Sequence, residues 1–423
     1  MATKSLPFSA ADILVPEVPD MSLWSVVACD QYTSEPQYWQ EVKHRVGQKP
    51  STLQLVLPEI YLGKEDFEER IENINTRMQE FLYMGIFHEY TDSLIYVERT
   101  VKSGWVRKGI LGKVDLLAYD YGKKSSSPIR ATEGTVMERI PARVKIRENA
   151  PLELPHVMLL IDDASNRVIA PVSSRKSEFE PLYNFSLMQG GGAVKGYLIP
   201  KELHNNIFAA LEELALKKNF DNKYDVKGKS PLLFAVGDGN HSLAAAKESY
   251  NKLAATLPAE QALAHPARYA LVELVNLHDH SLQFEAIHRV VFHVDPEKML
   301  DELFSSFDCE YGSSGGQCFG FITSRRSGSV VIKNPTSNLP VATLQGFLDR
   351  YISRFGGHID YIHGEDVVSR LSHEKRNIGF ILPSMDKADL FRTVILDGAL
   401  PRKTFSMGEA SEKRFYLEAR KIR

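Results

Sequence analysis

Four polar residues of different chemistry follow one another where a predicted strand ends and a predicted helix begins. They supply an acid, an amide, an imidazole and a hydroxyl: Asp238, Asn240, His241 and Ser242. The apolar run at 232–236 is typical of a strand buried on both faces, and apolar residues at helical spacing follow at 243–253. Gly237 and Gly239 allow the backbone to turn sharply between the two elements.

The start of this predicted helix is a candidate anion site. The first N–H groups of a helix lack intrahelical partners, and the helix dipole favours negative charge there. We therefore expect Gly239, Asn240 and Ser242 to bind phosphate. Asp238 would hold Mg²⁺ or orient His241, and His241 would contact a transferring phosphoryl group. The alternative is a plain strand–turn–helix in which Asn240 or Ser242 only caps the helix.

The sequence D-G-N-H at 238–241, followed by a helix of small residues, resembles the signature of a bacterial and archaeal family of unknown function. That signature is similar to the D-G-H-x-R turn of free serine kinases with a ParB/sulfiredoxin-like fold. The resemblance implies an α/β protein (α+β, with mixed sheets) whose ParB/sulfiredoxin-like core carries large insertions. Ser242 stands where Arg is usual, so a bidentate phosphate clamp is missing and other residues must recognise the donor.

Other segments resemble the family in the order of its motifs. Asp30 matches the acid of a Pro-Pro-Tyr-Asp segment, although the prolines are absent. Glu133 and Thr135 match an H-E-x-T segment, and Arg130 stands near its His. The resemblance implies that Asp30 or Glu133 is a general base. Independently of the resemblance, Arg130 could bracket a phosphate together with Arg139 and Arg143. A helix N-terminal acid at 30 and surface ion pairs near 133 are the alternatives.

Two further segments contain candidate phosphate-binding residues, among them an arginine and a lysine. His288 and Arg289 resemble a T-H-R stretch, and an Arg between strand residues is costly unless it meets an anion or an acid. Lys403 and Thr404 resemble a P-P-K-S-T-x-F tail, although the P-K that follows in the family is replaced here. We expect all four residues to bind phosphate. A strand-edge ion pair is the alternative for Arg289.

Two more polar clusters follow predicted strands. Asp162 and Asp163 end the strand 157–161 and could hold Mg²⁺ with phosphate oxygens, although a turn is the favoured interpretation. His278 and His280 follow the strand 269–275, but no Cys or Glu stands at metal-like spacing, so a polar loop is favoured.

Composition narrows the class of protein. A net charge of -3 argues against nucleic acid as a partner, and no apolar run approaches the roughly 20 residues of a membrane span. The three cysteines are widely spread, which suits a reducing cytoplasm. We expect a cytoplasmic protein whose partners are a small-molecule substrate and a phosphate donor. The sequence leaves the oligomeric state open.

The chain is long enough for two or three domains. We predict a catalytic body at 1–295 and a C-terminal α/β unit at 296–423 whose tail could return to the site. Within the body, apolar periodicity predicts helices at 65–82 and 201–218, and antiparallel strands at 94–101 and 107–116.

These observations predict a small-molecule kinase. The phosphate donor would be ATP, ADP or pyrophosphate with Mg²⁺, and the acceptor a hydroxylated metabolite such as L-serine. Two alternatives stay open. One is a sensor that binds a nucleotide or a phosphorylated metabolite without turnover, and the other is a partition-like nucleotide-binding protein.

Overall fold

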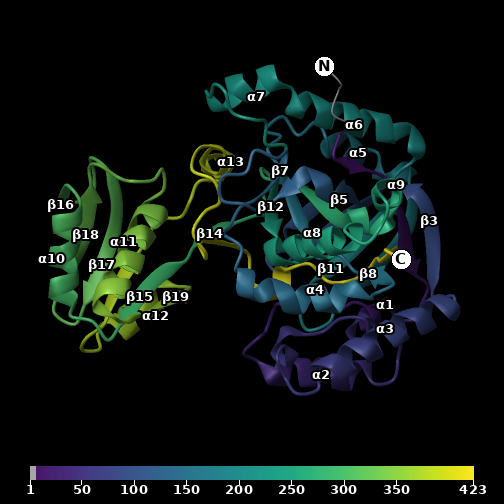
Figure 1. The fold of residues 1–423 in the computed structure, drawn as a ribbon, viewed down its shortest axis with the longest axis horizontal. Coiled ribbons are helices and arrows are strands. Elements are labelled where there is room, and N and C mark those ends of the chain that lie inside the picture. Colours follow the sequence, from purple (N-terminus) through teal and green to yellow (C-terminus); the bar gives the residue numbers. More distant parts are fainter. Residues whose placement is uncertain (1–5) are drawn as a thin grey trace. The chain divides into compact units, whose positions relative to one another are not determined.

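The computed structural model describes residues 6–423 and divides the chain into two compact units. Unit 1 contains residues 6–131, 135–282 and 409–423, and unit 2 contains residues 132–134 and 283–408. The boundary predicted at 295 therefore moves to 282, because β15 (His288–Phe292) pairs with two strands of unit 2. Figure 1 labels the elements.

Unit 1 is built on a ten-stranded sheet with the order β10-β11-β4-β5-β13-β9-β12-β7-β6, and β1 pairs with β5. Its strands are β1 (Phe8–Ser9), β4 (Ile95–Thr100), β5 (Val106–Asp115), β6 (Tyr119–Asp120), β7 (Ile129–Ala131), β9 (Met158–Ile161), β10 (Glu180–Ser186), β11 (Ala193–Leu198), β12 (Phe234–Asp238) and β13 (Tyr269–Asn276). Most pairs are antiparallel, but β12–β7, β13–β9 and β6–β7 are parallel. The predicted mixed α/β class is confirmed.

Helices cover the large sheet. They are α1 (Met21–Trp24), α2 (Pro36–Val46), α3 (Phe67–Tyr83), α4 (Ile140–Glu148), α5 (Ala170–Ser174), α6 (Lys201–Ala215), α7 (Lys217–Tyr224), α8 (Asn240–Ala254) and α9 (Ala259–Ala264). One apolar cluster joins the sheet to α4, α6 and α8, and a second joins it to α2 and residues 415–417. The predicted helices at 65–82 and 201–218 are confirmed as α3 and α6.

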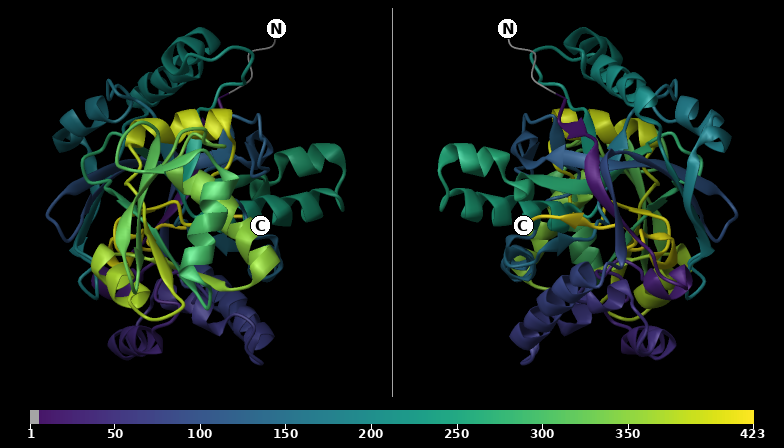
Figure 2. Two further views of the ribbon diagram at one scale, coloured as in Figure 1. Left: turned by 90° about the vertical axis from the view of Figure 1, so that its left-hand side faces the viewer. Right: turned by 90° about the vertical axis from the view of Figure 1, so that its right-hand side faces the viewer.

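The last residues of the chain return to unit 1. β22 (Arg420–Lys421) pairs with β8 (Leu152–Glu153), and Ala419 bridges to Leu14 in β2 (Ala11–Pro16), which itself pairs with β3 (Phe87–Ser93). In Figure 2 the yellow C-terminal segment lies among elements of this unit. Residues 409–423 thus complete a body that begins near residue 6.

Unit 2 has a six-stranded antiparallel sheet with the order β16-β18-β17-β20-β15-β19, and β14 pairs with β21. The strands other than β15 are β14 (Phe284–Ala286), β16 (Cys309–Tyr311), β17 (Gln317–Thr323), β18 (Ser327–Ile332), β19 (His358–Ile362), β20 (Ile378–Ile381) and β21 (Phe405–Met407). The helices are α10 (Pro296–Ser306), α11 (Pro340–Phe355), α12 (Glu365–Ser372) and α13 (Lys387–Leu396). Over residues 6–423, no helix has the length and apolar character needed to cross a bilayer.

Candidate active site

The turn between β12 and α8 has the backbone geometry that its glycines suggested. The pairing of β12 with β9 shifts between Val236 and Asp238, so Gly237 forms a bulge that turns Asp238 out of register. Gly239 is the N-cap of α8 with φ +81°, and an added Cβ would lie 3.1 Å from the Val157 Cα. Glycine is therefore required here both for its conformation and for the close approach of Val157, the residue before β9.

A histidine that no sequence motif marks lies beside this turn. The Nε2 of His156 is 2.9 Å from the Ser242 hydroxyl, and the imidazole is buried. The antiparallel pairing of β9 with β12 explains the contact, because the residues before β9 lie next to the residues after β12. Ser242 thus contacts an imidazole where relatives are expected to have an Arg.

The polar contacts continue from His156 to the end of the chain. The Tyr416 hydroxyl is 3.1 Å from His156 Nδ1 and donates to the Cys29 sulfur at 3.0 Å. Burial, with the nearby Asp30 charge, raises the pKa of the Cys29 thiol to about 12. Burial and the neighbouring Cys29 also raise the pKa of Tyr416. Both groups are therefore neutral near pH 7 and can only exchange hydrogen bonds.

Lys413 places a cation at the acid of the turn. Its Nζ is 3.5 Å from Asp238 Oδ2, and Asp238 Oδ1 accepts from the Gly239 N–H at 2.9 Å.

Asp30 interacts electrostatically with the same lysine. Burial alone would raise the pKa of Asp30, but His156, a hydrogen bond from Gln31 and the charge of Lys413 outweigh burial and lower it. Asp30 is therefore ionised near pH 7.

Two buried arginines fix the backbone that carries Lys413. Arg99 donates to the carbonyl of Lys413 at 3.2 Å and of Ser411 at 3.0 Å, and Arg107 donates to the carbonyl of Glu412 at 3.1 Å. Burial and the neighbouring Arg107 lower the pKa of Arg99 to about 9. Arg99 therefore still carries its charge near pH 7 and holds the carbonyls of Lys413 and Ser411 by charge-assisted hydrogen bonds.

His241 has a defined orientation at the first turn of α8. Its Nε2 accepts a hydrogen bond from the backbone N–H of Val136 at 3.1 Å. An imidazole nitrogen that accepts cannot carry a proton, so this contact places the ring proton on Nδ1 while His241 is neutral. The structure brings together Asp238, Asn240, His241 and Ser242 at the turn, with Lys413 and His156 beside them.

The sequence-predicted Arg130 lies elsewhere in unit 1. Its guanidinium donates to the carbonyls of Ser127 and Ser230, each at 2.7 Å, which precede β7 and β12. Because these two strands are parallel, Arg130 lies toward the end of β12 opposite Asp238. These hydrogen bonds stabilise the segments that lead into β7 and β12. They add no evidence for the predicted contact of Arg130 with phosphate.

The other predicted residues belong to unit 2. Arg289 is fully buried and donates to Gln345 Oε1 at 2.9 Å and to the carbonyl of Arg402 at 3.3 Å. The His288 Nδ1 accepts from the Leu382 N–H at 3.1 Å, and the Thr404 hydroxyl donates to the carbonyl of Pro401 at 2.7 Å. Glu133 bridges to Leu400, and Lys403 is an exposed residue with φ +56°. These contacts lie within unit 2, and the role of these residues in phosphate binding stays a prediction.

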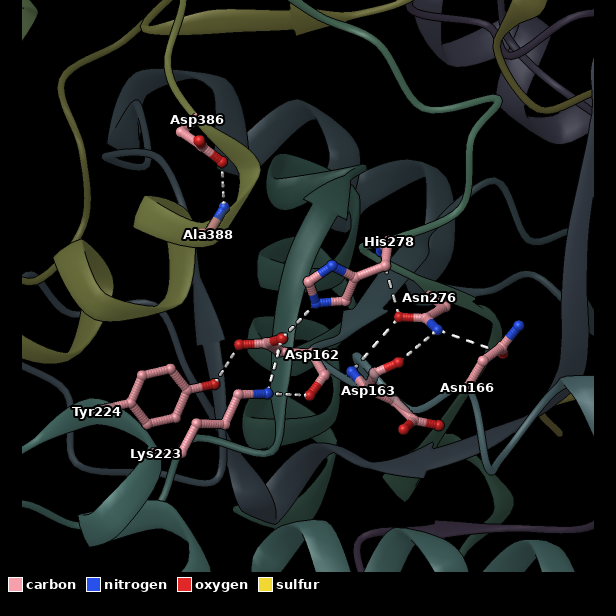
Figure 3. A network of polar contacts seen from close by, with 9 residues as sticks. All are labelled: Asp162, Asp163, Asn166, Lys223, Tyr224, Asn276, His278, Asp386 and Ala388. Atoms are coloured by element: carbon pink, nitrogen blue, oxygen red, sulfur yellow. Dashed lines mark hydrogen bonds and ion pairs between the residues drawn. The ribbon is translucent and has the colours of Figure 1, made fainter.

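Asp162 and His278, which the sequence placed in separate clusters, meet in unit 1. Figure 3 shows the Asp162 carboxylate among three donors: His278 Nε2 at 2.7 Å, Lys223 Nζ at 2.7 Å and the Tyr224 hydroxyl at 2.6 Å. Burial would raise the pKa of Asp162, but these donors outweigh it and lower the pKa. Asp163 begins a turn, with its carboxylate accepting from the Val168 N–H at 2.9 Å. In the described part of the chain, no group of three acidic, His or Cys residues could hold a metal ion.

Sequence reasoning missed His156, Tyr416 and Lys413. His156 follows a Pro and precedes a strand, and such a position has no motif. Tyr416 and Lys413 reach the turn only because residues 409–423 return to unit 1. One local signal was available: the largely polar run 409–414 is followed by the apolar residues 415–417, which indicates a segment that packs against a core.

Comparison with known proteins identifies a family. The model of the family described as "Protein of unknown function (DUF1015)" matches residues 6–351. No curated protein matches the sequence. A structure of free serine kinase in complex with AMP is similar at a TM-score of 0.38 and 9% identity, covering 73% of this chain and 91% of that one. SbnI with C-terminal truncation from Staphylococcus aureus is similar at 0.36 and 9%, covering 70% and 83%. A conserved hypothetical protein from Pyrococcus furiosus is similar at 0.35 and 11%, covering 72% and 90%.

Proposed function

We propose that this chain, which belongs to the DUF1015 family of unknown function, transfers a phosphoryl group from a phosphate donor to the hydroxyl of a small metabolite. The observation that carries the proposal is the convergence at the start of α8. There, a helix N-terminus capped only by glycine meets an acid, a cation and two imidazoles within unit 1. Such a constellation exceeds what capping a helix requires.

Each group has a role in this proposal. The donor phosphates would lie on the N–H groups at the start of α8, with Gly239, Asn240 and Ser242 lining the turn. Lys413 would neutralise charge on the transferring group, and His241 would contact it. Asp238 would hold Mg²⁺, since this ion is bound by one or two carboxylates together with substrate phosphates. The ion would supply charge neutralisation when bound.

The chemical step is a displacement at phosphorus. The bond between the transferred phosphorus and its bridging oxygen breaks, and the leaving phosphate keeps the electron pair. A bond forms between that phosphorus and the acceptor oxygen, whose proton passes to Asp30. Asp30 is preferred over Glu133 as the base because it lies in unit 1 beside His156 and Lys413. Arg289, Lys403, His288, Thr404 and Arg130 stay predictions for phosphate binding.

The donor remains ATP, ADP or pyrophosphate, and the family resemblance makes L-serine the reference acceptor. Incubation of the full chain with Mg²⁺, each donor and L-serine or a pool of hydroxylated metabolites, followed by ³¹P NMR, tests the proposal. We expect donor loss together with a new phosphomonoester signal. His241→Ala should lower the rate about 100-fold or more, and chelation of Mg²⁺ should abolish it. His280→Ala, in an exposed loop of the same unit, is the matched control.

One specific feature favours a second function. Ser242 replaces the expected Arg and its hydroxyl contacts His156, so the strongest phosphate ligand of the motif is missing. A sensor that binds a nucleotide or a phosphometabolite without turnover would have this property. Saturable donor binding with no phosphomonoester from any acceptor would support the sensor and contradict the kinase. Donor-dependent retention of DNA would instead support the partition-like alternative.

A further inference from the structure

A cavity of about 160 Å³ in unit 1 begins at the candidate active site. Its polar end is formed by the relay beside the turn, which consists of Cys29, His156, Ser242 and Tyr416. The remaining wall is largely apolar and comes from residues 55–62, α4, residues 150–157, α8 and the start of β13. Ser242 therefore lies in the first turn of α8, which would bind phosphate, and also lines the cavity.

The charged groups that line the cavity are already matched. They form two ion pairs, Arg143 with Glu59 and Arg147 with Glu153. Glu153 also accepts from Arg420 at 2.6 Å and from the Leu271 N–H at 2.9 Å. An ammonium group or a carboxylate would therefore have to compete with an existing ion pair. A zwitterion would lose hydration here without meeting an unpaired charge of opposite sign.

The size and the lining indicate one class of ligand. A cavity of about 150 Å³ with aliphatic and aromatic walls holds benzene in another protein. The cavity here has a similar volume and mostly aliphatic walls, which also include the two ion pairs, and it ends in a hydroxyl, an imidazole and a phenol. Transfer of a hydrocarbon group from water to such walls is favourable, by about 0.8 kcal/mol per buried CH₂. The polar end can exchange hydrogen bonds with one neutral hydroxyl.

We propose that this cavity binds the phosphoryl acceptor, and that the acceptor is a neutral alcohol with a compact hydrocarbon body, not a free amino acid. This inference rests on the proposed function and assigns its second substrate site. The acceptor hydroxyl lies at the polar end beside Ser242, and the hydrocarbon body lies against α4 and residues 150–157. The cavity thus sets which hydroxyl compounds reach the phosphate at the start of α8.

Binding of benzyl alcohol to the full chain, without any phosphate donor, tests the assignment. In a protein labelled at the isoleucine δ1-methyl groups, we expect saturable shifts at Ile146, which lines the cavity, and none at Ile378 in unit 2. Ile146→Trp should weaken binding at least tenfold by filling the space, as measured by saturation-transfer NMR on the alcohol. Leu216→Trp, at a site where the leucine is 54% exposed, should leave binding unchanged.

A second comparison tests the polar end. The wild-type chain should bind benzyl alcohol more tightly than toluene, and Tyr416→Phe should reduce that preference about threefold to tenfold through loss of one hydrogen bond. An unshifted Ile146 methyl would overturn the proposal. So would displacement of benzyl alcohol by AMP, which would make the cavity a base pocket, or tighter binding of L-serine at Ile146. Because no donor is present, failure of phosphoryl transfer would not affect these readouts, and their failure would leave the kinase test intact.

Discussion

The charge at the candidate site comes from a residue outside the D-G-N-H motif. Lys413 lies 3.5 Å from Asp238, and two buried arginines hold its backbone. The motif itself supplies no cation, because Ser242 stands where relatives are expected to have Arg. Lys413 is therefore the residue to which we assign neutralisation of the transferring phosphoryl group.

Lys413→Met should lower kcat about 100-fold with little change in the fold, since it removes one group that stabilises developing charge. The control is Lys217→Met, at a lysine that pairs with Asp221 on the surface of α7. Steady-state rates from ³¹P NMR measure both. An unchanged rate for Lys413→Met would contradict the role. The same measurement on Lys403→Met decides whether the lysine predicted from the sequence contributes.

His288 provides a pH-dependent contribution to the stability of unit 2. It is 5% exposed, and its Nδ1 accepts from the Leu382 N–H. Burial lowers the pKa of His288 below 6.5, opposed by the charge of Glu365 and assisted by Arg289 and His363. Below pH 6.5 the unfolded chain therefore binds a proton that the folded unit binds more weakly. This contribution is complete above pH 6.5 and is lost as the pH falls through the lowered pKa.

His288→Asn should remove that pH dependence, because the Asn carbonyl can accept the same hydrogen bond and does not titrate. Amide hydrogen exchange of β15 and β20, corrected for intrinsic rates, measures it between pH 5 and 7.5. We expect protection in the wild-type chain to fall on the acid side and to stay more nearly constant in the variant. Equal slopes in the two proteins would show that another group titrates.

At the scale of elements, the bulged end of β12 and the start of α8 depend on one glycine. Gly239→Ala would require a positive φ at a non-glycine residue and would press a Cβ to 3.1 Å from the Val157 Cα. Gly85→Ala is the matched control, because Gly85 has φ +66° and open space around it. Gly85→Ala isolates the conformational cost of a positive φ at alanine, about 1–2 kcal/mol.

We expect Gly239→Ala to lose about 2 kcal/mol or more of the free energy of unfolding, and also to weaken donor binding. Urea unfolding followed by tryptophan fluorescence reports on unit 1, because Trp24, Trp39 and Trp105 all lie in it. If Gly239→Ala and Gly85→Ala lost the same free energy of unfolding and both bound the donor normally, the close contact with Val157 would affect neither stability nor binding.

Local sequence patterns predicted helices and strands, whereas the pairing of distant strands determines which side chains meet at the candidate site. The 3.6-residue period gave α3 and α6, and the glycine-rich turn gave the end of β12 and the start of α8, because those signals depend on neighbours in the chain. The antiparallel pairing of β9 with β12 has no local signal, and it is what brings His156 to Ser242. Likewise, Asp162 and His278 looked like two separate clusters until the parallel pairing of β9 with β13 joined them.

At the scale of the whole molecule, the chain leaves unit 1 and returns to it twice. Residues 132–134 pair with Leu400 in unit 2, and residues 409–423 come back after the long excursion from 283 to 408. No local signal in the sequence marks these passages from one unit to the other. The sequence-based prediction therefore had a single boundary, at 295. The consequence is that Lys413 and Tyr416, which complete the candidate site, come from the far end of the chain.

Removal of residues 409–423 should therefore unfold unit 1. The segment buries five apolar side chains that are each at most 4% exposed: Phe415, Tyr416, Leu417, Ala419 and Ile422. Each large one contributes about 1.5–3 kcal/mol, so together they approach the 5–15 kcal/mol by which domains are stable. The Trp24 indole would also lose its bond to the Leu417 carbonyl, which is 2.9 Å long.

Phe415→Ala is the graded form of the same experiment, with an expected loss of about 3–5 kcal/mol. Tryptophan fluorescence in urea should show a lower midpoint for this variant and no cooperative transition for the truncated chain. Hydrogen exchange of β17 and β20 should stay protected in both, because those strands belong to unit 2. A truncated chain whose tryptophans still unfold at the wild-type midpoint would mean that unit 1 is complete without its last segment, and that Lys413 and Tyr416 reach the site without stabilising it.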